Sequence, residues 1–235
     1  MRLDKYLVAA GCCSRTEAKK IVRAGGVSIN GRVPKSSDEK VDPLCDEVIF
    51  CGKKVIYREF TYIMLNKPEG YVSATEDTRE KTVLDLLPPE VNKSGLFPCG
   101  RLDKNTLGLM LITDDGDLAH QLLAPKKHVS KVYGFECREP LSDSDIEKLC
   151  AGVDIGEDYV TKPAKVTLDG DTRQKGRITI DEGKYHQIKR MFEAVDNKIT
   201  YLERLEFGAL KLDGTLERGQ WRYLTDAEVA SLDKK

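Results

Sequence analysis

The sequence predicts an α+β protein of two domains, in which the larger domain contains a mixed, mainly antiparallel sheet flanked by helices. The length of 235 residues exceeds what one small domain needs. The start of the chain is basic and has the pattern of two helices and a hairpin. Further on, strand-like and helix-like segments follow one another without the strict alternation of a doubly wound parallel sheet.

The amino-terminal domain is predicted to begin with two helices and a hairpin. Apolar residues at helical spacing in MRLDKYLVAAG indicate a helix that ends at Gly11. Ser14 and Glu17 form a capping box for a second helix, which ends at the two glycines that follow it. In VSINGRVP, the pair Asn30-Gly31 is typical of a type I′ turn between two short strands.

The domain boundary is expected in the charged stretch after the strand of EVIFCGKKVIYREF. We place it after residue 58, which gives an amino-terminal domain of residues 1–58 and a larger domain of residues 59–235.

The larger domain is predicted to mix strands and helices. A strand is expected in 61–74, interrupted by a turn at 67–70, and another in the apolar run of GRLDKNTLGLMLIT. Further strands are expected at 131–138, 164–168, 177–181, 205–212 and 220–224. Helices are expected at 82–90, where Pro88 and Pro89 stop the helix, and at 116–125, where Pro125 ends it. Two more are expected at 141–153, with Ser142 as the cap and Gly152 beyond its end, and at 185–195.

The composition excludes several classes of protein. No apolar run approaches the ~20 residues that span a bilayer, and the apolar stretch in MRLDKYLVAAG is too short for a signal peptide, so we expect a cytoplasmic protein with no membrane partner. The seven cysteines form no C-x-x-C pair and the three histidines are scattered, so we expect no metal site.

The charge is distributed unevenly, although the net charge is only −1. Residues 1–37 contain eight basic groups and two acidic ones, whereas acidic groups predominate in the rest. Such a basic segment favours contact with a polyanion, and a merely solvated surface is the alternative. Its basic residues are Arg2, Lys5, Arg15, Lys19, Lys20, Arg23, Arg32 and Lys35.

Asp103, between Arg101 and Lys104, precedes the apolar run of CGRLDKNTLGLMLITDDGD. An aspartate at such a position commonly caps a turn. Because nearby cations favour the ionised carboxylate, it could instead be a nucleophile or general base. The three aspartates after the run have the pattern of turn and helix-start residues, with metal binding as the weaker alternative; they are Asp114, Asp115 and Asp117.

Two further segments contain candidate residues. In EGKYHQIKRMFEAV, Ile188 belongs to an apolar helical stripe, while Lys189 and Arg190 flank it, either as a solvated face or as cations that reach a carboxylate across a cleft. In SKVYGF, Tyr133 is either a core residue or a platform on which a base stacks.

Four stretches, NKPEGYV, GRLDKNTLGLMLITDDGDLAH, KVY and EGKYHQIKRMF, together resemble the motifs of the bacterial ribosomal-RNA pseudouridine synthases of the RsuA/RluB group. The resemblance covers essentially the whole chain. Its amino-terminal part is similar to the αL-motif, S4-like RNA-binding domain of ribosomal proteins and tRNA synthetases. The resemblance therefore implies an S4-like domain followed by a pseudouridine synthase domain.

By this resemblance, Asp103 matches the essential nucleophile, which acts on a uridine flipped out of its RNA stack. The reaction rejoins carbon-5 of the uracil to the ribose, and it needs no nucleotide, metal or redox cofactor. Tyr133 matches the residue that stacks on the target base, and Ile188 the aliphatic residue on its other face. Lys189 matches the cation that pairs with the aspartate, often Arg in relatives, and Arg101 matches an arginine near the gap left by the flipped nucleotide.

The resemblance also implies the partner. EGKYHQIKRMF is similar to the branch that modifies 16S rRNA, whereas relatives that modify 23S rRNA more often have E-G-R-N-R-Q-V-R-R-M. We therefore expect a monomer that acts on small-subunit RNA or an assembly intermediate. The amino-terminal domain would contact phosphates through Arg2, Lys5, Arg15, Lys19 and Arg23.

Three alternatives stay open. The first is a 23S rRNA pseudouridine synthase, and the second is a non-catalytic RNA-binding protein in which Asp103 is only a turn residue. The third is a nucleoside or glycoside hydrolase, which would usually need a second carboxylate at a defined separation.

Overall fold

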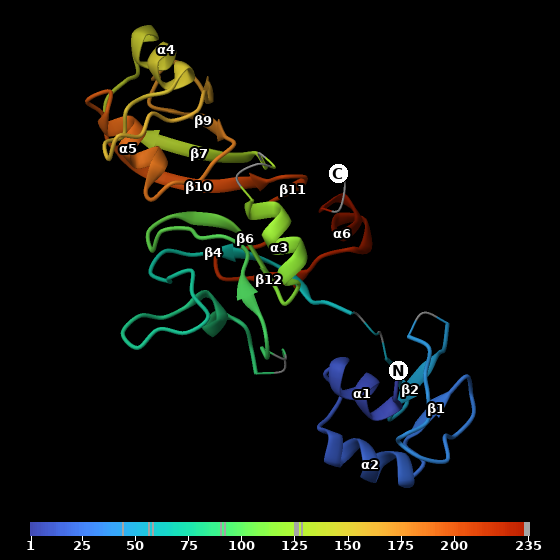
Figure 1. Ribbon diagram of the computed structural model, residues 1–235. Coiled ribbons are helices and arrows are strands. Elements are labelled where there is room, and N and C mark those ends of the chain that lie inside the picture. Colours follow the sequence, from blue (N-terminus) through green and yellow to red (C-terminus); the bar gives the residue numbers. More distant parts are fainter. Residues whose placement is uncertain are drawn as a thin grey trace. The chain divides into compact units, whose positions relative to one another are not determined.

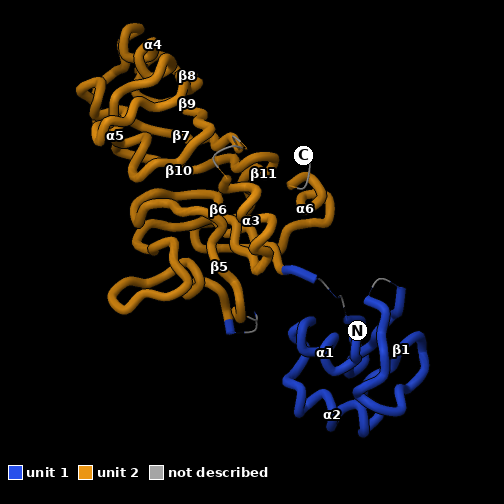
Figure 2. The backbone as a smooth tube through the Cα atoms, viewed as in Figure 1, with its two compact units in different colours: residues 1–60, 89–92 blue, residues 61–88, 93–235 orange. Residues whose placement is uncertain are grey.

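The computed structural model describes residues 1–43, 45–55, 57, 59–89, 91, 93–124, 127 and 129–232. The chain divides into two compact units, drawn in two colours in Figure 2. Unit 1 contains residues 1–60 and 89–92, and unit 2 contains residues 61–88 and 93–235. The boundary expected after residue 58 adjoins Arg58, which lies outside the described residues.

Unit 1 contains two short helices and a small sheet. Helix α1 (Leu3–Ala9) is followed by α2 (Arg15–Arg23), which begins at the predicted capping box of Ser14 and Glu17. The sheet has the order β1 (Val27–Ile29), β2 (Val48–Phe50) and β3 (Lys53–Lys54), with antiparallel pairs. The apolar faces of both helices pack on this sheet, and the core includes Leu3, Leu7, Ala18, Val22, Val27 and Val48.

The predicted hairpin at Asn30-Gly31 is only partly correct. Both residues have positive φ, 49° and 78°, and Ile29 and Arg32 exchange two backbone hydrogen bonds of 2.8 and 2.9 Å, as a type I′ turn requires. No strand follows the turn, however, and β1 pairs with β2 instead. Pro34 has no amide hydrogen to donate to a ladder, whereas the fully buried Val48 contributes to the core.

Unit 2 is built on a sheet to which nine described strands contribute, in the order β12-β4-β6-β10-β7-β9-β8, with β5 beside β6 and β11 beside β10 (Figure 1). Strands β6 and β10 run parallel, and the other described pairs are antiparallel, which confirms the mixed, mainly antiparallel sheet. The strands are β4 (Tyr62–Lys67), β5 (Phe97–Pro98), β6 (Leu107–Thr113), β7 (Lys131–Cys137), β8 (Lys165–Leu168), β9 (Lys175–Ile180), β10 (Ile199–Phe207), β11 (Leu210–Lys211) and β12 (Trp221–Tyr223).

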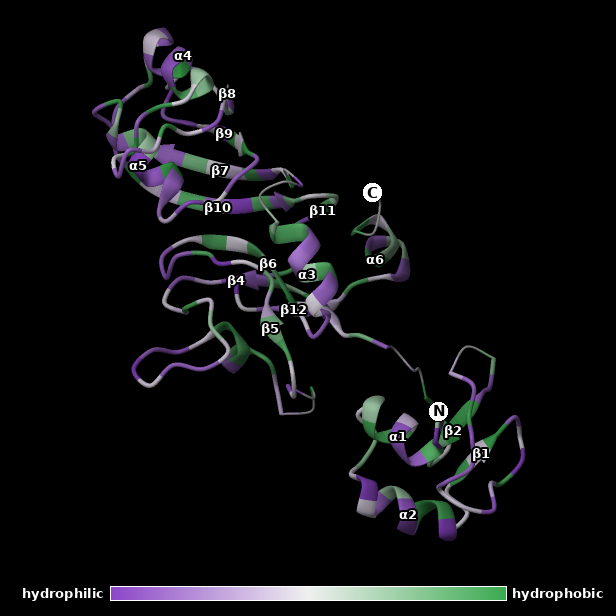
Figure 3. Ribbon diagram, in the orientation of Figure 1, coloured by the Kyte–Doolittle hydropathy of each residue, from purple (hydrophilic) through white to green (hydrophobic). Residues whose placement is uncertain are grey.

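The helices of unit 2 lie against this sheet, and apolar residues of α3, β4 and β6 belong to one core cluster. Figure 3 colours hydrophobic residues green, as along β6 and in parts of α3. They are α3 (Gly116–Leu123), α4 (Asp143–Ala151), α5 (Gln187–Glu193) and α6 (Asp226–Leu232). The cap of α4 by Ser142 is confirmed, and Pro125 lies outside the described residues. The helix predicted at 82–90 is a single 3-10 turn, Val83–Leu86. No helix in the described ranges is long and apolar enough to span a bilayer.

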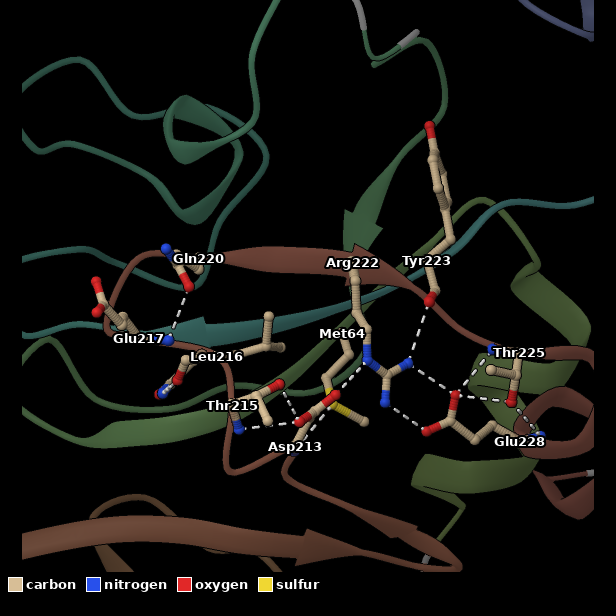
Figure 4. Close-up of polar contacts among 11 residues, drawn as sticks. Met64, Asp213, Thr215, Leu216, Glu217, Gln220, Arg222, Tyr223, Thr225 and Glu228 are labelled. Carbon is tan, nitrogen blue, oxygen red and sulfur yellow. Dashed lines mark hydrogen bonds and ion pairs between the residues drawn. The ribbon is translucent and has the colours of Figure 1, made fainter.

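Unit 2 also differs from the prediction at one strand and contains two elements that were not predicted. The single strand expected at 205–212 is wrong, because β10 already begins at Ile199 and a turn at Gly208, with φ of 57°, separates it from β11. The short strand β5 and the helix α6 were not predicted. Figure 4 shows how α6 is attached: Arg222 bonds to Glu228 in α6 and to Asp213, and Glu228 also accepts from Thr225 at the start of the helix.

Candidate active site

Asp103 lies in a loop that leads into β6, and the sheet holds this loop at several points. The hydroxyl of Ser73 donates to the Leu102 carbonyl (2.7 Å) and accepts from the Leu102 amide (2.9 Å). The Thr106 amide closes a turn by donating to the Asp103 carbonyl at 3.0 Å. At Gly108, with φ of 95°, an added Cβ would lie 2.3 Å from the Arg204 carbonyl, so a glycine is required where β6 meets the parallel strand β10. The loop is therefore fixed relative to the centre of the sheet.

Lys67, at the end of β4, also fixes the position of this loop. It is completely buried, and its ammonium donates to the carbonyls of Pro68 (3.0 Å), Lys104 (3.1 Å) and Thr106 (2.9 Å). Burial lowers the pKa of Lys67 to about 8, although the charge of Asp103 opposes this shift. Sequence reasoning did not single out Lys67, because a lysine at the end of a strand is usually exposed.

The carboxylate of Asp103 faces α5. Its Oδ2 accepts from Lys189 Nζ at 2.7 Å, and Lys189 Nζ also donates to Asn105 Oδ1 at 2.7 Å. His186 Nε2 lies 3.5 Å from the other oxygen, Oδ1. The ion pair that the sequence predicts between Asp103 and Lys189 is therefore present, while Asn105 and His186 are additional neighbours that the sequence did not indicate.

The five candidate residues of the larger domain line one cavity. These are Arg101, Asp103, Tyr133, Ile188 and Lys189. Tyr133 and Ile188 are 7% and 3% exposed, so each belongs to the core and at the same time contributes a face to the cavity. Asp103 and Lys189 are more accessible, with side chains 25% and 21% exposed. The cavity thus places an accessible carboxylate among an aromatic ring, an aliphatic side chain and a cation.

A hydroxyl in this cavity has an unusual environment. Thr106, which also lines it, is 2% exposed, and its Oγ1 is the one buried side-chain nitrogen or oxygen without a hydrogen-bond partner among the described residues. A buried hydroxyl without a hydrogen-bond partner costs stability, so the threonine at this position is unfavourable for folding.

The aspartates after β6 have structural partners. Asp115 caps α3 by accepting from the Leu118 amide at 2.9 Å and also accepts from the Tyr62 hydroxyl at 2.6 Å. Asp114 accepts from the Thr61 amide at 2.6 Å. These contacts support the turn and helix-start interpretation over metal binding. Within the described part of the chain, no group of three or more His, Cys, Asp or Glu residues could hold a metal ion.

In unit 1, four of the five basic residues expected to contact RNA border one hollow of the surface: Arg2, Lys5, Arg15 and Lys19. Asp4 lies among them and pairs with Arg2 at 2.8 Å, which neutralises part of the positive charge. Arg23, at the end of α2, does not border this hollow. The hollow is therefore basic but not uniformly so.

Comparisons with known proteins match both units. Residues 61–194 match the RNA pseudouridylate synthase family, and residues 1–48 match the S4 domain. A Bacillus subtilis protein named as an uncharacterized RNA pseudouridine synthase is 49% identical, over 100% of this chain and 99% of its own length. The ribosomal small subunit pseudouridine synthases A of Vibrio vulnificus and Escherichia coli are 43% and 38% identical, over 100% and 99% of this chain and 100% of their own lengths.

A solved structure shares the fold. The crystal structure of a pseudouridylate synthase matches with a TM-score of 0.69 at 35% identity, over 99% of each chain. The family match, the full-length relatives and the fold agree, and the chain therefore belongs to the RNA pseudouridylate synthase family.

Proposed function

We propose that this enzyme converts one uridine of small-subunit ribosomal RNA to pseudouridine, with Asp103 as the nucleophile. The observation that carries the proposal is the carboxylate of Asp103, bonded to Lys189 at 2.7 Å inside a cavity that Tyr133 and Ile188 also line. An aromatic face and an aliphatic face suit a flat uracil, and a nearby cation orients the carboxylate.

The proposed reaction is an isomerisation that conserves all atoms. The bond from C1′ of the ribose to N1 of the uracil breaks, the uracil turns, and a bond from C1′ to C5 forms. The proton on C5 is lost and N1 gains one, so there is no net oxidation or reduction. Asp103 provides the covalent catalysis, while Tyr133 and Ile188 hold the free uracil between them as it turns.

The target nucleotide has to leave its RNA helix to reach this cavity. Flipping a base costs a few kcal/mol, and stacking in the cavity offsets that cost. Arg101 lines the cavity and is exposed, and in this proposal it would interact with the RNA at the position that the flipped nucleotide has left.

The choice of small-subunit RNA rests on two observations. Relatives that match over essentially the full length are named ribosomal small subunit pseudouridine synthase A. The segment EGKYHQIKRMF, with Lys189 as the partner of Asp103, has the sequence that the resemblance associates with the 16S branch.

The amino-terminal unit would bind the RNA backbone through Arg2, Lys5, Arg15, Lys19 and Arg23. Such contacts position the RNA without reading its sequence. The proposal places the enzyme in the cytoplasm, acting on the RNA or on an assembly intermediate. The proposal also takes the enzyme to act as a monomer.

Chemical mapping of pseudouridine in ribosomal RNA from cells with and without this gene tests the proposal. We expect one pseudouridine of the small-subunit RNA to disappear and to return when the gene is restored. Loss of a site in the large-subunit RNA would favour the 23S alternative. An unchanged map would contradict the proposed function, and release of free uracil would indicate a hydrolase.

A further inference from the structure

A second cavity adjoins the candidate active site. Its walls come from the end of α3, the start of β7 and the segment after β9, and it shares Arg101, Tyr133, Gly183 and Lys184 with the first cavity. Lys131 and Arg204 line only the second cavity. The two cavities therefore have part of their walls in common.

Arg204, on β10, is a buried cation in this second cavity. It is 2% exposed, and its Nε donates to the Leu109 carbonyl at 2.8 Å. Its guanidinium carbon lies 4.9 Å from the centre of the Phe207 ring. In the described part of the chain, no carboxylate oxygen lies within 4.0 Å of it. Burying a charge without a counterion is costly, so this arrangement is unusual for a folded protein.

Lys131, at the start of β7, adds a second cation. Its Nζ donates to the Val129 carbonyl at 2.8 Å and lies 5.6 Å from the centre of the same Phe207 ring. Burial lowers the pKa of Lys131, and the positive charge of Arg204 lowers it further. The two cations therefore face one aromatic ring and repel each other.

The acidic residues of this cavity do not compensate these charges by direct contact. Glu182 already accepts from the Tyr159 hydroxyl (2.6 Å), the Lys162 amide (3.0 Å) and the Gln187 side-chain amide (2.6 Å). Asp181 also lines the cavity, but among the described residues it is not within 4.0 Å of Lys131 or Arg204. The exposed Arg101 and Lys184 add further positive charge at the shared wall.

We propose that this second cavity binds one phosphodiester group of the RNA substrate, next to the target uridine, through Lys131 and Arg204. The inference rests on the proposed function, because it assigns the bound anion to the RNA that the first cavity modifies. A guanidinium and an ammonium suit a phosphate, whose negative charge would relieve the repulsion between them. A nucleotide in the first cavity brings its own backbone to the shared wall, so its phosphate is within reach.

The test uses full-length protein and the shortest 16S rRNA fragment that the wild type modifies. A neutral methylphosphonate replaces one phosphodiester at a time around the modified uridine, and RNA affinity is measured over a salt series. One position next to that uridine should weaken binding to the wild type about tenfold. The same substitution should have no further effect on Lys131→Gln, because the contact is already lost.

Lys131→Gln should also lower the slope of log affinity against log salt by about 0.7, the value for one phosphate contact on a single strand. Lys175→Gln, which removes an exposed lysine paired with Glu136 on the same sheet, should keep the wild-type slope and phosphate dependence. Arg204→Lys keeps a charge at the buried position and should weaken binding less than Lys131→Gln does.

The outcomes separate this inference from the proposed function. If the wild type forms no pseudouridine in any fragment, the proposed function fails. If the wild type forms pseudouridine but Lys131→Gln retains both the wild-type salt slope and the wild-type loss at the same methylphosphonate, the phosphate site alone is refuted. Circular dichroism and thermal unfolding of Lys131→Gln confirm that the comparison uses folded protein.

Discussion

Lys189 Nζ and Asp103 Oδ2 are 2.7 Å apart, although the two residues are separated by 86 positions in the chain. The same ammonium donates to Asn105, two residues after Asp103 in the loop. One side chain of α5 therefore holds both the carboxylate and the loop that presents it, and this contact couples two parts of the sheet at the candidate active site.

Lys189→Met should lower kcat much more than it lowers stability. Both side chains are about one fifth to one quarter exposed, so the ion pair contributes at most ~1 kcal/mol to folding. A misplaced nucleophile, in contrast, costs about 100-fold in rate. Single-turnover kinetics and thermal unfolding of the same sample measure the two effects. Equal losses in the barrier and in the unfolding free energy would argue against a role in positioning Asp103.

Lys67→Met should reduce both stability and activity. The substitution leaves the carbonyls of Pro68, Lys104 and Thr106 without the ammonium that they share, and an unsatisfied buried group costs about 1–3 kcal/mol. Lys104→Met is the control, because that lysine is half exposed and pairs with Glu80 on the surface. Denaturant unfolding that gives the same free energy for both variants would contradict this account of Lys67.

The buried Lys67 also predicts a difference in pH dependence. Its pKa is about 8 in the folded protein and 10.5 for an exposed lysine, so between these values the unfolded chain binds more protons. The cost of burying the charge is therefore present below about pH 8 and is relieved as the pH rises toward 10.5. Between these two pH values, the wild type should gain stability relative to Lys67→Met.

Glu228→Gln should make the protein less sensitive to acid. Bonds from Arg222 hold the pKa of Glu228 at about 2, against 4.5 for an exposed glutamate. The stabilisation is complete above pH 4.5 and is lost as the pH falls toward 2. Stability measured against pH should show a flatter acid limb for Glu228→Gln than for the wild type. Glu80→Gln, which removes an exposed ion pair, should retain the wild-type limb.

Thr106→Val should not destabilise the protein, although it replaces a buried polar residue. The hydroxyl of Thr106 has no partner, so a methyl group in its place removes an unsatisfied group and should stabilise by about 1 kcal/mol. Thr161→Val is the matched control, because the Thr161 hydroxyl accepts from the Val153 amide at 3.0 Å and its loss should destabilise. A clear loss of stability in Thr106→Val would show that its hydroxyl has a partner in solution.

The sequence predicted most of the secondary structure because local signals were strong. Local signals such as the capping box at Ser14, the cap at Ser142 and the apolar stripes placed the helices α1 to α5 correctly. The helix α6 was missed, although Thr225 and Glu228 have the spacing of a capping box and do bond to each other. The strand β10 was misplaced because its first three residues are half-buried or exposed, and its position depends on pairing with β7.

The candidate site was predictable only where a motif resembled a known family. Residue spacing alone could not place Lys189 beside Asp103, because that contact requires the sheet to bring distant segments together. Lys67, Asn105 and His186 were missed for the same reason: their positions near Asp103 depend on the tertiary fold, and their residue types are unremarkable in the sequence.

The most direct test of the central claim compares the wild type with Asp103→Asn on transcribed 16S rRNA. Asparagine has nearly the same shape but is not a nucleophile, so the variant should fold and bind RNA as the wild type does. We expect the wild type to form pseudouridine at one position and Asp103→Asn to form none, as read by chemical mapping. Formation of pseudouridine at the wild-type rate by Asp103→Asn would contradict the assignment of Asp103 as the nucleophile.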